Sequence, residues 1–319
     1  MPHRALVVGD LMLDVFSEGH AGRLSPEAPV PVVLQSTRVY TPGGAGNAAA
    51  NLAALGDEVT LVAAVGDDPE GLRLRAGLNA AGVKDQALIT GNGPTTYKHR
   101  VIANGQQVVR LDVEQPAEPE LTAACLDQVR RSIGAVDVVL ISDYAKGLCT
   151  PEVCAEVIRL ARALRIPVVV DPKGVDYSRY RGAKLITPNL AELNQATPAN
   201  LSTLQQKALA LVDSLGSAVL VTRSADGMSL FDGHFPELHL PTQARTVLDV
   251  TGAGDTVASI VGALLGRGAP LKDACRVANA CAGVVVGRRG TSPITSGELL
   301  EVWEAELPSE AGVKIPAKS

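Results

Sequence analysis

Two carboxylates and three small residues occur together in Asp249-Val-Thr-Gly-Ala-Gly-Asp255, which runs directly into an apolar segment of helical period. If a helix begins here, the amides of Ala253, Gly254 and Asp255 have no partner within it, and the helix dipole adds partial positive charge. The turn would then hold an anion, with the Asp255 carboxylate beside it to orient a hydroxyl and accept its proton. Such a pair suits phosphoryl transfer, which depends on positioning and charge neutralisation. A plain glycine turn and helix N-cap would explain the same residues.

A second glycine-rich stretch, Thr41-Pro-Gly-Gly-Ala-Gly-Asn47, precedes an alanine-rich segment. Gly43 and Gly44 allow the backbone to approach a ligand closely. Asn47 offers both a donor and an acceptor, as a sugar hydroxyl requires. A tight strand-to-helix turn is the alternative interpretation.

The segment Asn189-Leu-Ala-Glu192 follows the short run Leu185-Ile-Thr-Pro188. Residues three apart share one face of a helix, so the Asn189 amide oxygen and the Glu192 carboxylate could hold a hydrated Mg²⁺, which keeps several of its waters. The alternative is a capping box at the start of a helix.

Three cations, Lys98, Arg100 and Arg110, alternate along a predicted hairpin whose turn is Asn104-Gly105. In an acidic chain they form a local patch that suits a phosphate on a sugar. A solvated edge strand also carries Lys and Arg, so this alternative stays open.

Lys173 and Asp143 each follow a predicted strand. Lys173 is placed to reach the phosphates of the substrate or of ATP. Asp143 could orient the sugar, support the residues that do so, or cap its own loop.

Hydrophobic patterning predicts the elements that position these residues. Runs such as Val136-Asp-Val-Val-Leu-Ile141 are almost entirely apolar, as expected for strands buried on both faces of a parallel sheet. We predict strands at 5–9, 59–65, 136–142, 167–171, 184–187 and 218–222. We predict helices at 46–55, 69–81, 121–133, 151–164, 201–214, 253–265, 271–286 and 296–305. Their alternation indicates an α/β fold, a doubly wound and mostly parallel sheet with helices on both faces.

Two regions break this alternation, at about 11–39 and 95–112. We expect them to form a small separate β-sheet that covers a ligand or pairs with another subunit, although a decorative hairpin is the simpler interpretation. Residues 1–306 are predicted to form one domain, and 307–319 a flexible tail.

Composition narrows the function further. The 319 residues carry a net charge of −5, which does not favour nucleic-acid binding, and only 3% are aromatic, which does not favour base stacking. No signal peptide and no membrane-spanning run is recognisable, so we expect a cytoplasmic protein with no membrane partner. The five cysteines include no metal-binding pair and are expected to be reduced and buried.

In this order, the Gly-Gly motif, Asn-x-x-Glu and Asp-x-x-Gly-x-Gly-Asp resemble the ribokinase-like carbohydrate kinase family. The resemblance reaches to about Trp303 and implies a doubly wound α/β domain with a small β lid. It also implies an ATP- and Mg²⁺-dependent kinase of a sugar or nucleoside hydroxyl. Asp255 would be the catalytic base, and Gly252, Ala253 and Gly254 the anion hole.

The same resemblance implies the remaining ligand contacts. Asn189 and Glu192 would position the metal and phosphates, while Asp249 and Thr251 match positions that often bind a monovalent cation such as K⁺. The expected ATP-cleft residues are Asn189, Thr222, Ser224, Gly227 and, on a helix flanking adenine, Asn279.

Within that family, Thr95-Thr-Tyr-Lys-His-Arg100, Ser142-Asp-Tyr-Ala-Lys-Gly147 and Asp171-Pro-Lys-Gly174 resemble the stand-alone heptose 7-phosphate kinases. This implies transfer of the ATP γ-phosphate to the anomeric hydroxyl of D-glycero-β-D-manno-heptose 7-phosphate, in ADP-heptose and lipopolysaccharide synthesis. The expected sugar-phosphate contacts are Asp14, Gly43, Gly44, Asn47, Lys98, Arg110, Asp112, Asp143 and Lys173, with Lys98 and Arg110 on the 7-phosphate.

Two other functions stay open: a kinase of another sugar, sugar phosphate or nucleoside, and a non-catalytic ligand sensor on the same scaffold. An unpaired lid edge also makes a homodimer through the lid the expected assembly.

Overall fold

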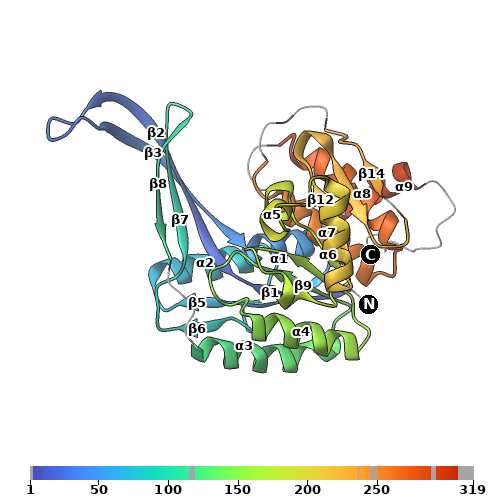
Figure 1. Ribbon diagram of the computed structural model, residues 1–319. Helices are drawn as coiled ribbons and strands as arrows, with labels where there is room; N and C mark the ends of the chain where they lie inside the picture. The colour runs from blue at the N-terminus through green and yellow to red at the C-terminus, as the bar shows by residue number, and fades with distance from the viewer. Residues whose placement is uncertain are drawn as a thin grey trace.

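The computed structural model describes residues 3–114, 119–235, 237–244, 247, 250–288 and 292–307. Its main sheet has eight strands in the order β14-β13-β12-β11-β10-β9-β1-β4 (Figure 1). The strands from β12 to β4 in this order are parallel, β13 runs antiparallel to β12, and β14 runs antiparallel to β13. Their bounds are β1 Arg4–Gly9, β4 Glu58–Val62, β9 Val138–Ser142, β10 Val168–Asp171, β11 Leu185–Ile186, β12 Ala218–Thr222, β13 Met228–Phe231 and β14 Leu238–Leu240.

Helices cover both faces of this sheet, with α1 and α7 on one face and α3 and α4 on the other (Figure 1). The helices are α1 Ala45–Ala54, α2 Pro69–Ala80, α3 Pro119–Ser132, α4 Pro151–Ala163, α5 Leu190–Ala196, α6 Leu204–Leu215, α7 Ala253–Gly266, α8 Leu271–Val285 and α9 Ser296–Glu306. Short 3₁₀ turns lie at Ile133–Ala135, Ser178–Tyr180 and Ser224–Asp226. The predicted doubly wound fold is confirmed.

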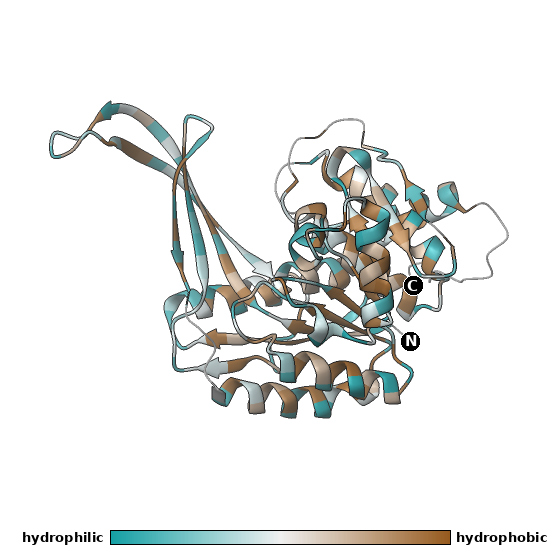
Figure 2. Cartoon of the chain, in the orientation of Figure 1, coloured by the Kyte–Doolittle hydropathy of each residue, from teal (hydrophilic) through white to brown (hydrophobic). Residues whose placement is uncertain are grey.

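The core consists of the apolar strand runs and the helix faces that cover them, which Figure 2 colours brown. Val138 to Ile141 and Val168 to Val170 are buried on both faces, because helices lie above and below them. None of the described helices is long and apolar enough to cross a membrane.

A second sheet of four strands, in the order β3-β2-β7-β8, extends from the domain as a long arm (Figure 1). It comprises β2 Leu11–Leu24, β3 Pro31–Gly44, β7 Tyr97–Ala103 and β8 Gln106–Val113. We call this sheet the lid. Asn104 and Gly105 both have positive φ and form the hairpin turn, as predicted. The first lid segment reaches Gly44, so the glycine pair ends a lid strand and leads directly into α1.

Two predicted elements were wrong in detail. The strand predicted at 59–65 is interrupted at Ala63, because β4 pairs with β1 whereas β5 (Ala64–Gly66) pairs with β6 (Ile89–Gly91). The helix predicted from 201 begins at Leu204, because the Thr203 side chain accepts a hydrogen bond from Gln206 N and acts as the N-cap. The tail predicted beyond 307 lies outside the described residues, as does Asp249.

Candidate active site

The N-terminus of α7 lies on a glycine turn, as the sequence predicts. Gly252 has φ 76° and is the N-cap, a conformation that favours glycine. The first hydrogen bond of the helix runs from Thr256 N to Gly252 O at 2.9 Å, so the amides of Gly254 and Asp255 precede the helical ladder. A Cβ added to Gly254 would meet no atom of the described residues within 4 Å. Open space therefore lies beside these amides, where an anion could bind.

One of the three amides expected to bind an anion, that of Ala253, already donates a hydrogen bond. The Ala253 amide donates to the Val250 carbonyl at 3.2 Å. This acceptor lies before the helix, so the Ala253 amide has no intrahelical partner, as predicted, but the turn already uses its hydrogen.

Asp255 is buried at 4% exposure, and both of its carboxylate oxygens accept hydrogen bonds. Asn47 Nδ2 donates to Oδ2 at 2.7 Å, and the Tyr144 hydroxyl donates to Oδ1 at 2.9 Å. Burial raises the pKa of Asp255 to about 6, although both hydrogen bonds favour the ionised form. A carboxyl group with this pKa can exchange a proton near neutral pH.

Asn47 reaches Asp255 because α1 packs beside α7 with both N-termini at the same end. The Ser259 hydroxyl, one turn along α7 from Asp255, donates to the carbonyl of Ala48, the residue after Asn47, at 3.1 Å. At the far end of the two helices, Arg267 and Asp57 form an ion pair at 2.6 Å with side-chain exposures of 4% and 1%. Gly44 lets the start of α1 approach the segment that follows β1, since a Cβ on Gly44 would lie 2.4 Å from the Asp10 carbonyl oxygen.

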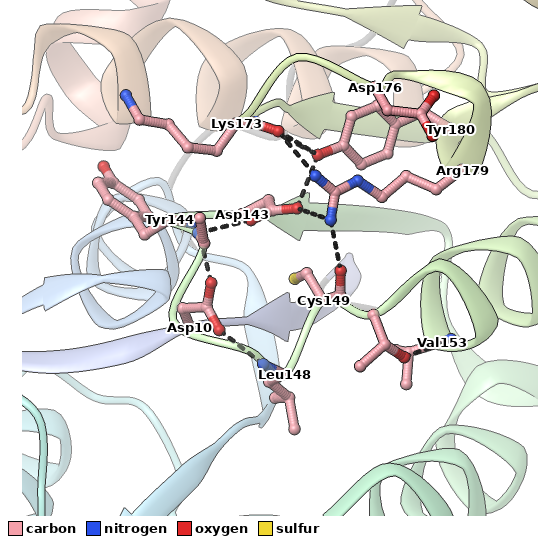
Figure 3. Close-up of polar contacts among 12 residues, drawn as sticks. Asp10, Asp143, Tyr144, Leu148, Cys149, Val153, Lys173, Asp176, Arg179 and Tyr180 are labelled. Atoms are coloured by element: carbon pink, nitrogen blue, oxygen red, sulfur yellow. Dashed lines mark hydrogen bonds and ion pairs between the residues drawn. The ribbon is translucent and has the colours of Figure 1, made fainter. Parts of the chain in front are cut away.

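Tyr144 was not identified from the sequence as a site residue. Its loop is anchored by the buried Asp10 carboxylate, which accepts hydrogen bonds from the amides of Tyr144, Lys146 and Leu148 (Figure 3). The segment Ser142-Asp143-Tyr144 follows a predicted strand, but nothing in the sequence indicates that the Tyr144 side chain reaches the base.

Asp143 points away from Tyr144 into a separate buried network (Figure 3). Its oxygens accept hydrogen bonds from the Tyr180 hydroxyl at 2.6 Å and from the Ala145 amide at 2.7 Å, and Arg179 lies 3.4 Å away. Both oxygens are therefore occupied, which favours a role in holding the loop over direct sugar contact. The thiols of Cys149 and Cys154 lie near this carboxylate, but the Arg179 guanidinium makes the cluster unfavourable for a cation.

The lid brings several predicted substrate contacts onto one face. Lys98 lies opposite Asp14 on β2 and opposite Asp112 on β8, and Arg100 lies opposite Arg110. Positions directly opposite share a face, as do positions two apart on one strand. The predicted common face of the cations is thus confirmed.

Each of the lid cations has a different environment. Arg100 pairs with Asp14 at 2.6 Å, and Arg110 pairs with Asp112 of its own strand at 2.9 Å. Lys98 makes no ion pair in the described part of the chain, and its ammonium lies 5.8 Å from the centre of the Tyr144 ring. Burial and the neighbouring Lys146 lower the pKa of Lys98. A bound anion beside Lys98 would favour its charged form and so oppose the lowering of its pKa by burial and by Lys146.

The Asn189-to-Glu192 segment forms a capping box, the alternative interpretation of these residues. Asn189 Oδ1 accepts from Glu192 N at 2.9 Å, and Glu192 Oε2 accepts from Asn189 N at 3.0 Å. Glu192 Oε1 also pairs with Lys173 Nζ at 2.7 Å. Lys173 and Glu192 are thereby brought together, next to the end of β10.

Asp171, at the end of β10, was also missed as a site residue. Burial and the nearby Asp255 and Glu192 carboxylates raise its pKa well above the usual value. Among the described residues, these three carboxylates do not lie close enough together to bind one cation directly. A Mg²⁺ ion that keeps several of its own waters needs only one or two carboxylates, so Asp171 and Glu192 fit a hydrated ion carried by a phosphate ligand.

The predicted ATP-cleft residues occupy neighbouring segments. Asn189 and Thr222 form an isolated bridge between the ends of β11 and β12. Gly227 has φ 77°, and a Cβ there would lie 2.1 Å from the Leu240 carbonyl oxygen. Asn279, buried on α8, donates to the Pro241 carbonyl at 2.8 Å. Ser224 begins the 3₁₀ turn Ser224–Asp226 after β12. Thr251, which was predicted to bind a monovalent cation, lies just before α7.

Solved structures with the same fold include Arabidopsis thaliana ribokinase complexed with ribose and ATP, with a TM-score of 0.74 and 22% identity over 95% of this chain and 99% of that one. Escherichia coli phosphofructokinase-2 in complex with potassium has a TM-score of 0.78 and 19% identity over 96% and 99%. At these identities, the likeness establishes a ribokinase-like α/β fold.

Curated relatives are more similar in sequence. The bifunctional protein HldE of Shewanella amazonensis is 46% identical over 315 residues, which are 98% of this chain and 66% of the relative. The protein of the same name from Shewanella sp. strain ANA-3 is 48% identical over 302 residues, which are 93% and 63%. The chain thus spans just under two thirds of the length of these relatives. Residues 3–296 match the family described as pfkB family carbohydrate kinase. With Asp255 beside a glycine turn and a lid facing it, the chain belongs to the pfkB family and is a carbohydrate kinase.

Proposed function

We propose that the protein transfers the γ-phosphate of ATP to the anomeric 1-hydroxyl of D-glycero-β-D-manno-heptose 7-phosphate. The product would be the 1,7-bisphosphate used in ADP-heptose and lipopolysaccharide core synthesis, a cytoplasmic step because it consumes ATP. The motifs that resemble heptose 7-phosphate kinases support this acceptor. The name HldE, shared by relatives 46% and 48% identical, is consistent with it.

The observation that carries the phosphorylated acceptor is the cationic face of the lid. Lys98 lies near the base of the lid, next to Tyr144, and the Arg100–Arg110 pair lies two positions farther out. Two strand positions correspond to about 7 Å. A sugar with its reacting hydroxyl at Asp255 and a phosphate at its far end would meet these cations in turn. We assign the 7-phosphate to Lys98 and Arg110, and the sugar hydroxyls to Asp14, Asn47 and Asp112.

In the proposed reaction, Asp255 accepts the proton of the 1-hydroxyl as that oxygen bonds to the γ-phosphorus. The bond from the γ-phosphorus to the bridging oxygen breaks, and ADP leaves. The amides of Gly254 and Asp255 would stabilise charge on the transferred group, and the α7 dipole adds to this effect. Asn47 keeps the carboxylate oriented throughout.

Mg²⁺ bound with ATP would neutralise phosphate charge. Asn189 and Glu192 would hold its water shell, with Asp171 close to them. Lys173 would reach the phosphates once it is released from Glu192. A K⁺ site at Asp249 and Thr251 stays a prediction, since Asp249 lies outside the described residues.

The decisive experiment measures ADP release by the wild-type protein with Mg·ATP and a panel of acceptors. We expect the highest kcat/KM with the heptose 7-phosphate, and a value at least about 100-fold lower for the same heptose without phosphate, because charge-assisted contacts are lost. A preference for a free sugar or a nucleoside would reject the proposed acceptor but leave the kinase assignment. Tight sugar binding with no transfer to any acceptor would instead support a ligand sensor.

A matched pair of lid variants tests the phosphate contact. Lys98→Gln should raise KM for the phosphorylated sugar at least about tenfold with little change in kcat. Arg38→Gln removes a cation from the opposite face of the lid, where Arg38 contacts Ser17, and should leave KM unchanged. Equal effects of the two variants would mean that general lid charge, and not a phosphate contact, is being measured.

We also propose that a second copy of the chain covers the lid. Three apolar side chains of the lid are largely exposed to solvent: Leu34, Val39 and Leu111, at 66%, 51% and 53%. This is a large exposed apolar surface for so small a sheet. Light scattering should give a dimer, and Leu111→Lys should weaken it. Leu164→Lys, at a 51% exposed position after α4, is the control. A monomeric wild-type protein at micromolar concentration would reject the dimer.

A further inference from the structure

Both hydrogen bonds to Asp255 come from side chains, but the two donors differ in kind. Asn47 lies within the first turns of α1, and its carbonyl accepts from Asn51 Nδ2 at 2.9 Å, so it is fixed by the helix. Tyr144 lies on a loop, and it presents an O–H group 2.9 Å from Asp255 Oδ1. This is the contact that an acceptor hydroxyl must make with its general base.

The surroundings of Tyr144 place its ring between the base and the lid. A Cβ on Gly44 would lie 3.5 Å from Tyr144 Cδ2, so the ring packs on the glycine pair. Lys98 of the lid lies on the face of the same ring, and Asp10 fixes the Tyr144 amide. Burial and the Asp255 charge raise the pKa of Tyr144 well above its usual value, so its hydroxyl keeps its proton.

We propose that the Tyr144 hydroxyl holds the place of the acceptor hydroxyl on Asp255 until sugar binds, and so denies that place to water. Tyr144 is thus a positioning residue that limits wasteful ATP hydrolysis. The acceptor hydroxyl displaces it from Oδ1 and then gives its proton to Asp255 as the new O–P bond forms. In the wasteful reaction, water would take the same position, give its proton to Asp255 and yield inorganic phosphate and ADP. The inference rests on the proposed role of Asp255 in phosphoryl transfer.

The test compares Tyr144→Phe with Tyr177→Phe. Tyr177 is a matched control, because its hydroxyl is buried with no hydrogen-bond partner among the described residues and does not touch Asp255. With Mg·ATP and no sugar, Tyr144→Phe should hydrolyse ATP about tenfold faster than wild type, which corresponds to the loss of one hydrogen bond.

Unchanged sugar-free hydrolysis in Tyr144→Phe, or an equal rise in Tyr177→Phe, overturns the inference. Circular dichroism checks folding, and Tyr144→Met provides a second variant without the hydroxyl that must show the same rise. Because hydrolysis is measured without sugar, a wrong acceptor assignment does not affect this readout. That assignment fails separately, in the wild-type acceptor panel.

A pH profile separates this role from a merely structural one. The titratable groups facing Asp255 are the Tyr144 hydroxyl and the Asp14 and Asp171 carboxylates. The Tyr144 hydrogen bond favours the ionised form of Asp255, so its loss should move the acid limb of kcat/KM to higher pH. Tyr177→Phe should leave that limb in place. An unmoved limb in Tyr144→Phe counts against the proposed contact.

Discussion

Asp255 and Arg110 lie at opposite ends of the proposed acceptor contacts, and their surroundings differ. Asp255 is 4% exposed, sits at the start of a helix packed into the core, and is held by two side chains from other elements. Arg110 has a half-exposed side chain on an edge strand of the lid and pairs with Asp112 two residues along. Packing of the whole domain therefore positions the base, whereas only neighbouring strand residues position the outer cation.

This difference predicts two kinds of mutational effect. Changes near Asp255 should act on kcat or on folding, because the geometry there is built by the core. Changes on the lid should act mainly on KM, because its cations contact the substrate without supporting the domain.

The largest effect is expected for Asp255→Asn. The amide cannot accept the proton, so kcat should fall by about 10²-fold or more, while ATP should bind within about threefold of wild type. Stopped assays of product formation and calorimetric titration with ATP measure the two quantities. Turnover at the parental rate would show that Asp255 is not the base.

The next effect concerns stability. Arg267→Ala leaves the Asp57 carboxylate buried without its partner, which should lower the free energy of unfolding by about 3–5 kcal/mol. Lys84→Ala breaks the exposed pair with Glu58, whose side chains are 65% and 47% exposed, and should cost less than about 1 kcal/mol. Urea denaturation of both variants provides the comparison. Equal losses would mean that the core and the surface contribute alike.

Much of the core part was predictable from the sequence. The apolar runs of β9 and β10 predict buried parallel strands, and the glycine turn before Asp255 predicts a helix start with a base beside it. Those features depend on neighbouring residues alone. The lid was predicted from its hairpin turn and from the two segments that break the alternation of strands and helices, which are also local features.

What escaped prediction depends on contacts between distant parts of the chain. Tyr144 and Asp255 are 111 residues apart, and Asp10, from a third part of the chain, anchors the loop that carries Tyr144. The ion pair of Lys173 with Glu192 similarly joins the ends of two elements. Local residue types cannot indicate such contacts, since many polar residues follow strands without meeting.

A smaller effect is expected from pH. The base must be ionised, and burial places its pKa at about 6. Below that value each pH unit should lower kcat/KM about tenfold, while above it the rate should level off. The profile is measured with the heptose 7-phosphate at constant ionic strength. A flat profile down to about pH 5 would mean that the carboxyl is more acidic, and so better solvated, than its burial implies.

The smallest effect is expected for Arg110→Gln. The guanidinium is half exposed and already paired with Asp112, so its contribution to phosphate binding is screened by water and shared with a carboxylate. KM for the sugar phosphate should rise only about two- to fivefold, less than for Lys98→Gln, and the difference from wild type should shrink as salt is raised from about 0.05 to 0.5 M. An effect larger than that of Lys98→Gln, or one that salt leaves unchanged, would mean that Arg110 becomes buried when sugar binds. The lid would then close over its substrate, and Arg110 would become buried, as Asp255 already is.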